Sequence, residues 1–202
     1  MQTASLPQAE RKFSDLKPEL RTNEAGQNEL FGYALKFDVP YDMSWFTESI
    51  SRDAFKNADI TDVRVLLNHD PSIILGRTTA GTAQVGFDEV GMWYRATLPD
   101  SPNGQNVRVA LERGDITQSS WAFYTRISEN GNGDEWTRVN GRDHRTITDV
   151  RAVVDASPVT YPANPDTLAA KRIFDARSAS ADMEHRNKEL EIAEAELMLA
   201  AV

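Results

Sequence analysis

The chain has 202 residues, of which 40% are hydrophobic and 26% are charged, a composition that can bury the core of one soluble domain. Its 22 basic and 31 acidic residues give a formal net charge of −9. An acidic surface opposes binding to nucleic-acid phosphates and to anionic lipid, so we expect neither nucleic acid nor membrane as a partner. Cysteine is absent, which excludes disulfides, thiolate metal sites and cysteine nucleophiles.

Residues 1–28 are polar, with Pro7, Pro18 and charges of both signs. We expect a loose N-terminal arm here, or at most one strand that docks late in folding. Neither this segment nor a later one has the apolar run of a signal peptide or of a membrane-spanning helix.

Short strand-like runs dominate residues 29–172. Apolar residues recur at strand spacing in LFGYALKFDV from Leu30, VRVLL from Val63 and MWYRATL from Met92. The run SWFTESISRDAFKNA predicts a short helix, and QNVRVALERG predicts another that ends at Gly114. Many short strands with few helices predict a mainly β domain with flanking helices, of the α+β class, built as a barrel or a sandwich.

Residues 173–202 form the third part of the predicted organisation, a helical tail without glycine or proline. Met183, Leu190 and Leu197 recur every seven positions and make one narrow seam. The seam can pack on the chain's own domain or on a second copy in a homo-oligomer, or it can dock a partner in an assembly. The pattern itself does not decide between these alternatives.

Three histidines limit any histidine-dependent chemistry to positions 69, 144 and 185. His69 follows the predicted strand VRVLL, and a strand end can hold a base rigidly at the rim of a cleft. His144 lies in the polar segment NGRDHRT next to a predicted hairpin, and His185 lies on the charged tail. The alternative for His69 is an ordinary hydrogen-bonded loop histidine.

Two other polar positions interrupt apolar runs. Ser120, next to Ser119, precedes WAFY, and Asp155 follows two valines in VVDASPVT. An unpaired buried hydroxyl costs about 1–3 kcal/mol, and an isolated buried carboxylate is also costly, so each needs a partner. A serine bonded to an imidazole that a carboxylate orients is a nucleophile, and the alternative is a structural hydrogen bond at each residue.

Four segments carry a resemblance to a known family over about two-thirds of the chain. They are FGYALKFDV, LLNHDPSIILGRTTAGTAQV, DEVGMWYRATLPDSPNGQNVRVALERGDITQSSWAF and DASPVTYPANPDTLAAKR. In order and spacing they resemble the prohead (procapsid) maturation proteases of tailed phages of the Hong Kong type, which are distantly similar to herpesvirus assemblin. The resemblance implies a serine endopeptidase on a compact assemblin-like β-barrel, without a cofactor or a metal.

The resemblance also implies roles for individual residues. His69 corresponds to the base, Ser120 to the nucleophile and Asp155 to the third member of the catalytic group. Assemblin uses a second histidine in the third place, so His144 is the alternative there. Ser119 is the neighbouring serine, and it would face the opposite side of the strand.

By the same resemblance, the substrates are the major capsid protein with its scaffolding segment and the protease itself. Cleavage would take place in the host cytoplasm, inside the assembling prohead. Lys171-Arg172, at the polar junction between the domain and the tail, is the expected self-cleavage region.

Two other functions stay open. The family has glycine at the position of Ala122, and a methyl group there is tolerable only where the backbone φ is negative. The altered Trp121-Ala122 pair and the long tail helix together suggest an inactive homologue that serves as an internal scaffold or docks to the capsid. The second is a barrel that binds a small molecule among Trp93, Trp121 and Tyr124.

Overall fold

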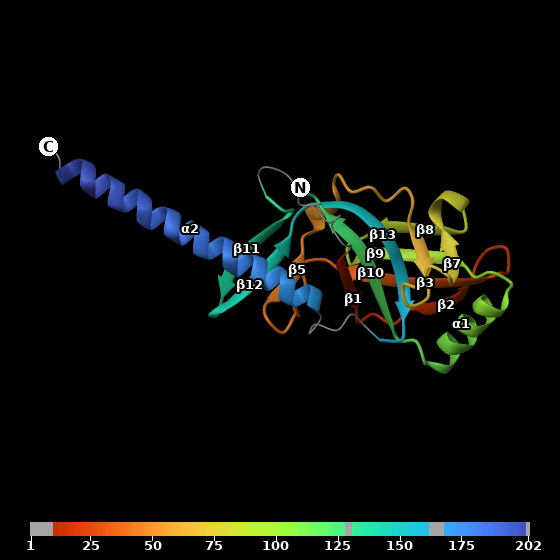
Figure 1. The fold of residues 1–202 in the computed structure, drawn as a ribbon. Coiled ribbons are helices and arrows are strands. Elements are labelled where there is room, and N and C mark those ends of the chain that lie inside the picture. Colours follow the sequence, from red (N-terminus) through yellow and green to blue (C-terminus); the bar gives the residue numbers. More distant parts are fainter. Residues whose placement is uncertain (1–9, 128–130, 162–167, 201–202) are drawn as a thin grey trace.

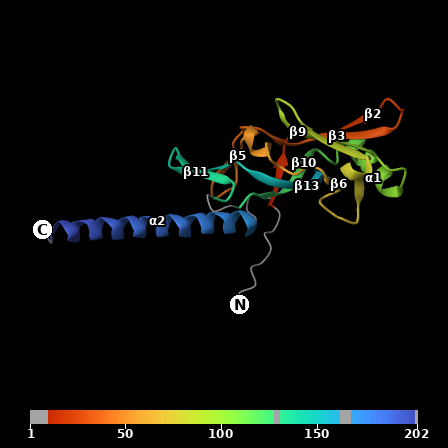
Figure 2. The same cartoon turned by 90° about the horizontal axis from the view of Figure 1, so that it is seen from above.

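A computed structural model describes residues 10–127, 131–161 and 168–200, without the side chains of 11–14, 168–170, 184–185 and 192–200. The side chains of His185 and of the seam residue Leu197 are therefore outside the described part. The described strands form three sheets of five, four and four strands (Figure 1). Two helices, α1 (Pro102–Arg113) and α2 (Leu168–Ala200), lie at opposite ends of the sheets (Figures 1 and 2).

The five-stranded sheet joins segments from distant parts of the chain. Its order is β1 (Glu10–Ser14), β10 (Gln118–Thr125), β13 (Val150–Val159), β6 (Arg64–Leu66) and β7 (Ile74–Arg77). β13 and β6 are parallel, whereas the other neighbours are antiparallel. β10 and β13 are inner strands, and most of their residues are buried.

The other two sheets have four strands each. The first has the order β2 (Glu19–Thr22), β3 (Asn28–Lys36), β9 (Gly91–Thr97) and β8 (Ala83–Phe87). The second has the order β11 (Asp134–Val139), β12 (Arg142–Ile147), β5 (Thr47–Ile50) and β4 (Tyr41–Asp42). Two short 3-10 helices, η1 (Arg52–Phe55) and η2 (Thr78–Ala80), connect strands.

The main core lies where β10 and β13 face β3 and β9. Trp121, Phe123 and Tyr94 are fully buried there, and the rings of Trp121 and Phe123 stack with centroids 3.8 Å apart. Gly32 of β3 leaves room for Tyr94, because a Cβ at residue 32 would lie 2.7 Å from the tyrosine oxygen. Trp121 is therefore a core residue, as aromatic side chains in short-strand proteins usually are.

The mainly β prediction with a C-terminal helix is confirmed, but the described strands form three open sheets and not a closed barrel. The described residues 10–28 contain two strands, β1 and β2, where a loose arm or at most one strand was expected. Both are edge strands. An edge strand pairs on one side only and tolerates charged residues, so it lacks the apolar alternation that predicts an inner strand.

The predicted helix over residues 44–58 is wrong for most of its length. Thr47–Ile50 is strand β5, and only the four residues of η1 are helical. The predicted helix ending at Gly114 is confirmed as α1, which the hydroxyl of Ser101 caps by accepting the Gly104 N–H at 3.4 Å. Gly114 follows it with φ 79°, a left-handed conformation that favours glycine.

Helix α2 begins at Leu168, earlier than the predicted tail. Ile173 and Phe174 pack against the buried Met43 and Phe46. Beyond these first turns the helix extends past the strands (Figures 1 and 2). Among its described seam residues, Met183 and Leu190 are 61% and 62% exposed, so the chain's own sheets do not cover them. No helix in the described residues is long and apolar enough to cross a membrane.

A buried ion cluster connects β1 to the sheet of β12. Arg145 of β12 is 3% exposed, and its guanidinium contacts Glu10 at 2.6 Å, Glu48 at 2.9 Å and Asp134 at 2.6 Å. Burial disfavours the charge of Arg145, but the three carboxylates outweigh this effect and raise its pKa. Tyr41 also donates a hydrogen bond to Glu48, so the cluster links β1, β4, β5, β11 and β12.

Removing the cation from this cluster should be costly. We expect Arg145→Ala to lower the free energy of unfolding by about 3–5 kcal/mol, because Glu48 is fully buried and would lose its countercharge. The control is Lys56→Ala, which breaks an exposed pair with Asp53 and should cost at most about 1 kcal/mol. Urea unfolding at neutral pH measures both. Equal losses in the two variants would contradict a stabilising role for the cluster.

Candidate active site

His69 lies in the turn between β6 and β7, in an unusual backbone conformation. Asn68 and His69 have φ values of 55° and 58°, in the left-handed region that Asn and His enter more readily than most residues. The Asn68 N–H donates to the carbonyl of Pro158 at 3.1 Å, and its side-chain carbonyl accepts from the N–H of Thr160 at 2.8 Å. These bonds attach the turn to the end of β13.

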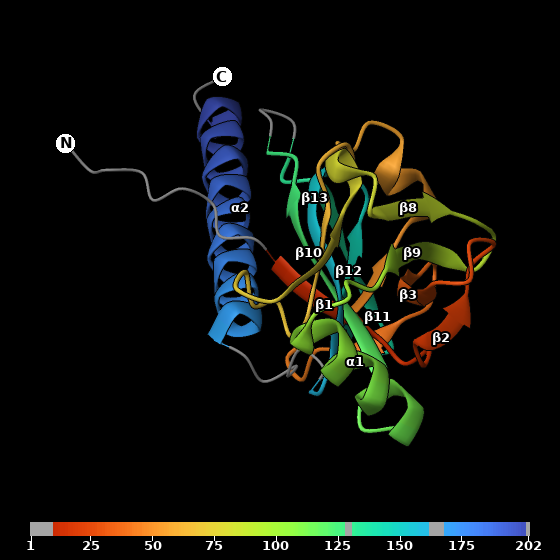
Figure 3. The same ribbon diagram turned by 90° about the vertical axis from the view of Figure 1, so that its right-hand side faces the viewer.

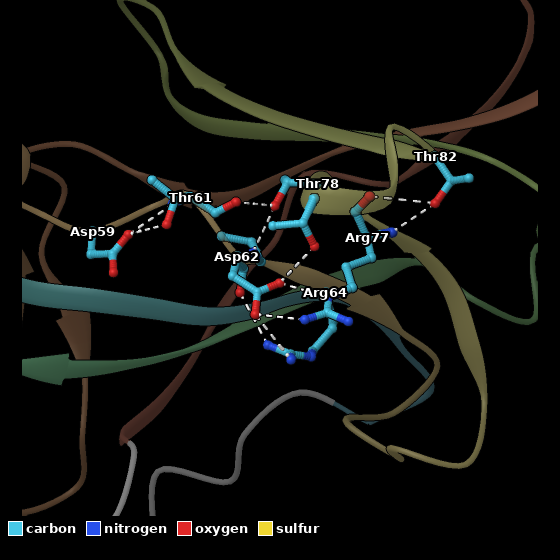
Figure 4. Close-up of polar contacts among 9 residues, drawn as sticks. Asp59, Thr61, Asp62, Arg64, Arg77, Thr78 and Thr82 are labelled. Atoms are coloured by element: carbon cyan, nitrogen blue, oxygen red, sulfur yellow. Dashed lines mark hydrogen bonds and ion pairs between the residues drawn. The ribbon is translucent and has the colours of Figure 1, made fainter.

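The base of the same hairpin is closed by charged groups (Figure 4). Asp62, just before β6, accepts from Nε and Nη2 of Arg77 at 2.6 and 2.8 Å, and Arg64 lies 3.1 Å from the same carboxylate. The hydrogen bonds from Arg77 hold the pKa of Asp62 well below its usual range. The hairpin that carries His69 is thus attached at both ends.

Ser120 lies on inner strand β10, with 1% of its surface exposed. Its Oγ is 2.8 Å from Nε2 of His69. The neighbouring Ser119 faces the other side of the strand, where its Oγ is 2.9 Å from the hydroxyl of Tyr94. Burial raises the pKa of Tyr94, so this hydroxyl stays neutral. The two serines therefore have separate hydrogen-bond partners.

Asp155 lies on β13 directly opposite Ala122 of β10. The next pair is Phe123 with Val153, so a β-bulge leaves Val154 unpaired beside Asp155. The Oδ1 atom of Asp155 is 2.6 Å from Nδ1 of His69 and accepts a hydrogen bond from Ser157 at 2.5 Å. The side chains of His69 and Asp155 are only 9% and 4% exposed.

Three side chains from separate segments thus form one chain of hydrogen bonds. A carboxylate only accepts, so the contact with Asp155 places the imidazole proton on Nδ1 of His69. Nε2 is then free to accept the hydroxyl proton of Ser120. Both distances are within the reach that general-base catalysis requires. The arrangement can therefore deprotonate a serine for attack on an acyl carbon.

The remaining expected residues lie elsewhere. His144 of β12 is 2.8 Å from the Thr47 hydroxyl and 3.0 Å from that of Ser49, both on β5, and so belongs to another sheet. Trp93 of β9 stacks on Phe31, away from the buried Trp121. In the described residues, no group of three or more His, Asp or Glu side chains could hold a metal ion.

Two polar residues that support the site, Ser157 and Asn68, were not predicted from the sequence. Ser157 is fully buried and donates to Asp155, and its position two residues along the same strand is the signal that could have found it. Asn68 was treated only as a neighbour of His69. Its bonds to Pro158 and Thr160 join segments about 90 residues apart, and no local pattern encodes them.

The departure at Ala122 does not distort the site. Ala122 lies inside strand β10, and its φ is outside the left-handed region. Its side chain is 2% exposed, so the methyl group is accommodated in the packed sheet. The condition under which alanine is tolerable in place of glycine is met.

A mainly β domain with serine, histidine and aspartate in one hydrogen-bonded chain has the site architecture of a serine protease. The chain belongs to the caudovirus prohead serine protease family, whose family model matches residues 16–184. The resemblance to the prohead proteases of tailed phages is thereby confirmed.

Outside the family model, the chain has a low-identity match to a solved structure. Among solved structures, the chain is similar to the capsid assembly protease gp21 of bacteriophage T4, at 12% identity and a TM-score of 0.41. The match covers 74% of this chain and 97% of that one. A search of curated protein sequences gives no match.

Alanine variants are usually more stable than glycine variants, and the left-handed turn at Asn68 should reverse this order of stability. At φ 55° we expect Asn68→Ala to be less stable than Asn68→Gly by about 1 kcal/mol, because both lose the side-chain bonds but only alanine is strained. In the exposed strand position Gln84, glycine should instead be the less stable replacement, by about 0.5–1 kcal/mol. Free energies of unfolding measure both pairs, and the same order at both positions would contradict the strain.

Proposed function

We propose that this chain is an active serine endopeptidase that cleaves capsid or scaffold protein during prohead maturation. One observation carries the proposal: His69 lies 2.8 Å from the Ser120 oxygen and 2.6 Å from the Asp155 carboxylate. Membership of the prohead serine protease family supports the same chemistry. The activity of this member and the roles of its residues are what the experiment below tests.

In the proposed mechanism, Ser120 Oγ attacks the carbonyl carbon of a peptide bond while Nε2 of His69 takes its proton. The protonated imidazole then gives this proton to the leaving amine, and an acyl-enzyme on Ser120 remains. Water, deprotonated by His69, releases the acyl group. Asp155 orients the ring and stabilises its charged form, and the Ser157 hydroxyl holds Asp155 in place.

We propose the major capsid protein, with its scaffolding segment, and the protease itself as substrates inside the assembling shell. The junction at Lys171-Arg172 remains the proposed self-cleavage region. These residues lie near the start of α2, where Lys171 pairs with Asp175. A helix cannot enter a protease site as an extended peptide, so cleavage there requires the first turns of α2 to unwind.

The catalytic proposal is favoured over an inactive scaffold. The inactive alternative rests on the altered Trp121-Ala122 pair and on the long tail helix; the strand accommodates Ala122 without strain. We assign contact with other proteins of the shell, or with a second copy of the chain, to the tail helix, because Met183 and Leu190 remain exposed on it. An active enzyme that is retained through its tail needs no separate scaffold role.

Replacing the nucleophile tests the proposal. We expect Ser120→Ala to lower processing of the co-expressed major capsid protein of the same phage by at least about 10³-fold, because no other group can form the acyl-enzyme. Ser119→Ala is the matched control and should keep processing within about threefold, since Ser119 faces Tyr94. Gel analysis of the capsid protein measures both, with circular dichroism to match folding. Processing by Ser120→Ala at the wild-type rate would refute the catalytic assignment.

A further inference from the structure

The proposed active site is closed in the full chain. Ser120 is 1% exposed, and the side chains of His69 and Asp155 are 9% and 4% exposed. A polypeptide substrate cannot bring a carbonyl carbon to a buried serine oxygen. Some segment next to Ser120 must therefore move before a protein substrate binds.

The neighbours of Ser120 differ in what their departure would cost. β13 carries Asp155, and the β6–β7 turn carries His69, so moving either one dismantles the hydrogen-bonded chain. β1 carries none of the three groups. It pairs antiparallel with β10 on the edge away from β13, with Phe13 opposite Ser120 (Figure 3). Of these neighbours, β1 alone can leave with the triad intact.

The sheet holds β1 on one side only. β1 is a five-residue edge strand whose only ladder partner in the sheet is β10. Glu10 anchors its start by accepting from Nη1 and Nη2 of Arg145 at 2.6 and 3.0 Å. If Glu10 leaves, Arg145 keeps Glu48 and Asp134 as partners, so the buried cation stays paired.

β1 precedes the part of the chain that the family model matches. The match to the prohead serine protease family begins at residue 16, after the last residue of β1. The matched region contains β10, β13 and the β6–β7 turn, and therefore all of the hydrogen-bonded chain. β1 therefore lies outside the matched region and carries none of the hydrogen-bonded groups.

A vacated β10 edge would present the backbone N–H and C=O groups of residues 119–123. Such an edge binds extended peptides by adding them as a new strand. We propose that the substrate binds as an extended strand on this edge of β10, in the place of β1, and that β1 is a built-in competitor that keeps the free protease closed. This inference rests on the proposed protease function and names how its substrate binds.

A disulfide that locks β1 in place tests the inference in the full chain. Arg11 and Ala122 are directly opposed, and the Cα atoms of such pairs lie about 4.5–5.5 Å apart, within the range for a disulfide. The chain has no cysteine, so Arg11→Cys with Ala122→Cys can form one bond only. The control is Arg21→Cys with Glu29→Cys, which locks edge strand β2 onto β3.

Capsid-protein cleavage is compared between the oxidised and reduced forms of each double variant, so that effects of the substitutions themselves cancel. We expect oxidation of the 11–122 pair to lower the rate at least about 10-fold and dithiothreitol to restore it, because a locked β1 excludes the substrate strand. The control pair should change by less than about twofold on oxidation. Equal rates for the oxidised and reduced 11–122 variant would overturn the inference.

A second experiment opens the β10 edge by substitution in β1 and measures peptide binding, which does not depend on catalysis. In a Ser120→Ala background, Lys12→Pro with Phe13→Pro removes one N–H that faces β10, since neighbouring N–H groups alternate in direction along a strand. We expect this variant to bind a fluorescein-labelled peptide of residues 8–16 at least about 10-fold more tightly than Ser120→Ala alone, by fluorescence anisotropy. Leu20→Pro with Arg21→Pro in β2 is the control and should not gain affinity. No gain from opening β1 would overturn the inference.

The two arms separate this inference from the proposed function. Peptide binding that depends on opening β1, without cleavage by the wild-type chain, would refute the protease and leave the β10 edge as a peptide-binding site. Cleavage that depends on Ser120 but ignores both the lock and the prolines would refute the inference and leave the protease.

Discussion

The hydrogen bond between Nδ1 of His69 and the carboxylate of Asp155 is the contact on which the account depends. It joins the turn after β6 to inner strand β13 at a place where both side chains are nearly excluded from solvent. A carboxylate that is buried in this way is costly unless it is hydrogen-bonded. The imidazole and the Ser157 hydroxyl meet that need and fix the ring, so that its other nitrogen faces Ser120.

The turn that carries His69 has a strained backbone and is held by hydrogen bonds and ion pairs. Two consecutive residues, Asn68 and His69, adopt the left-handed conformation, which most side chains avoid. Asn68 compensates by bonding to the end of β13, and Asp62 with Arg77 closes the base of the same hairpin. The base is therefore held in a turn that is attached at both ends, and the nucleophile lies on inner strand β10. The neighbouring segment β1 is short and lies at the edge of its sheet. The proposed exchange of β1 for a substrate strand requires this combination of a fixed catalytic group and a short edge strand.

The sequence could predict much of the site because His69, Ser120 and Asp155 each stand out from an apolar run, and because the family resemblance aligns all three. The third member stayed open between Asp155 and His144, since pairing between distant strands leaves no local pattern; His144 lies instead against β5. The edge strands β1 and β2 were hidden by their polar composition, and β5 was mistaken for part of a helix. The inner strands β3 and β9 were predictable because burial on a sheet face imposes a period of two, whereas β10 is buried on both faces and stood out as an apolar and aromatic run.

The most direct test is the position and rate at which a small serine-directed organophosphorus reagent modifies the intact chain, mapped by peptide mass spectrometry. Such a reagent can reach Ser120 during brief local openings of the closed site. The account predicts one adduct, on Ser120, at a rate that falls at least about 100-fold in His69→Ala, because the imidazole activates that hydroxyl. The rate should also fall in Asp155→Asn and stay within about twofold in His144→Gln, whose side chain contacts Thr47 and Ser49. An adduct on Ser119, or a rate on Ser120 that does not depend on His69, would contradict it.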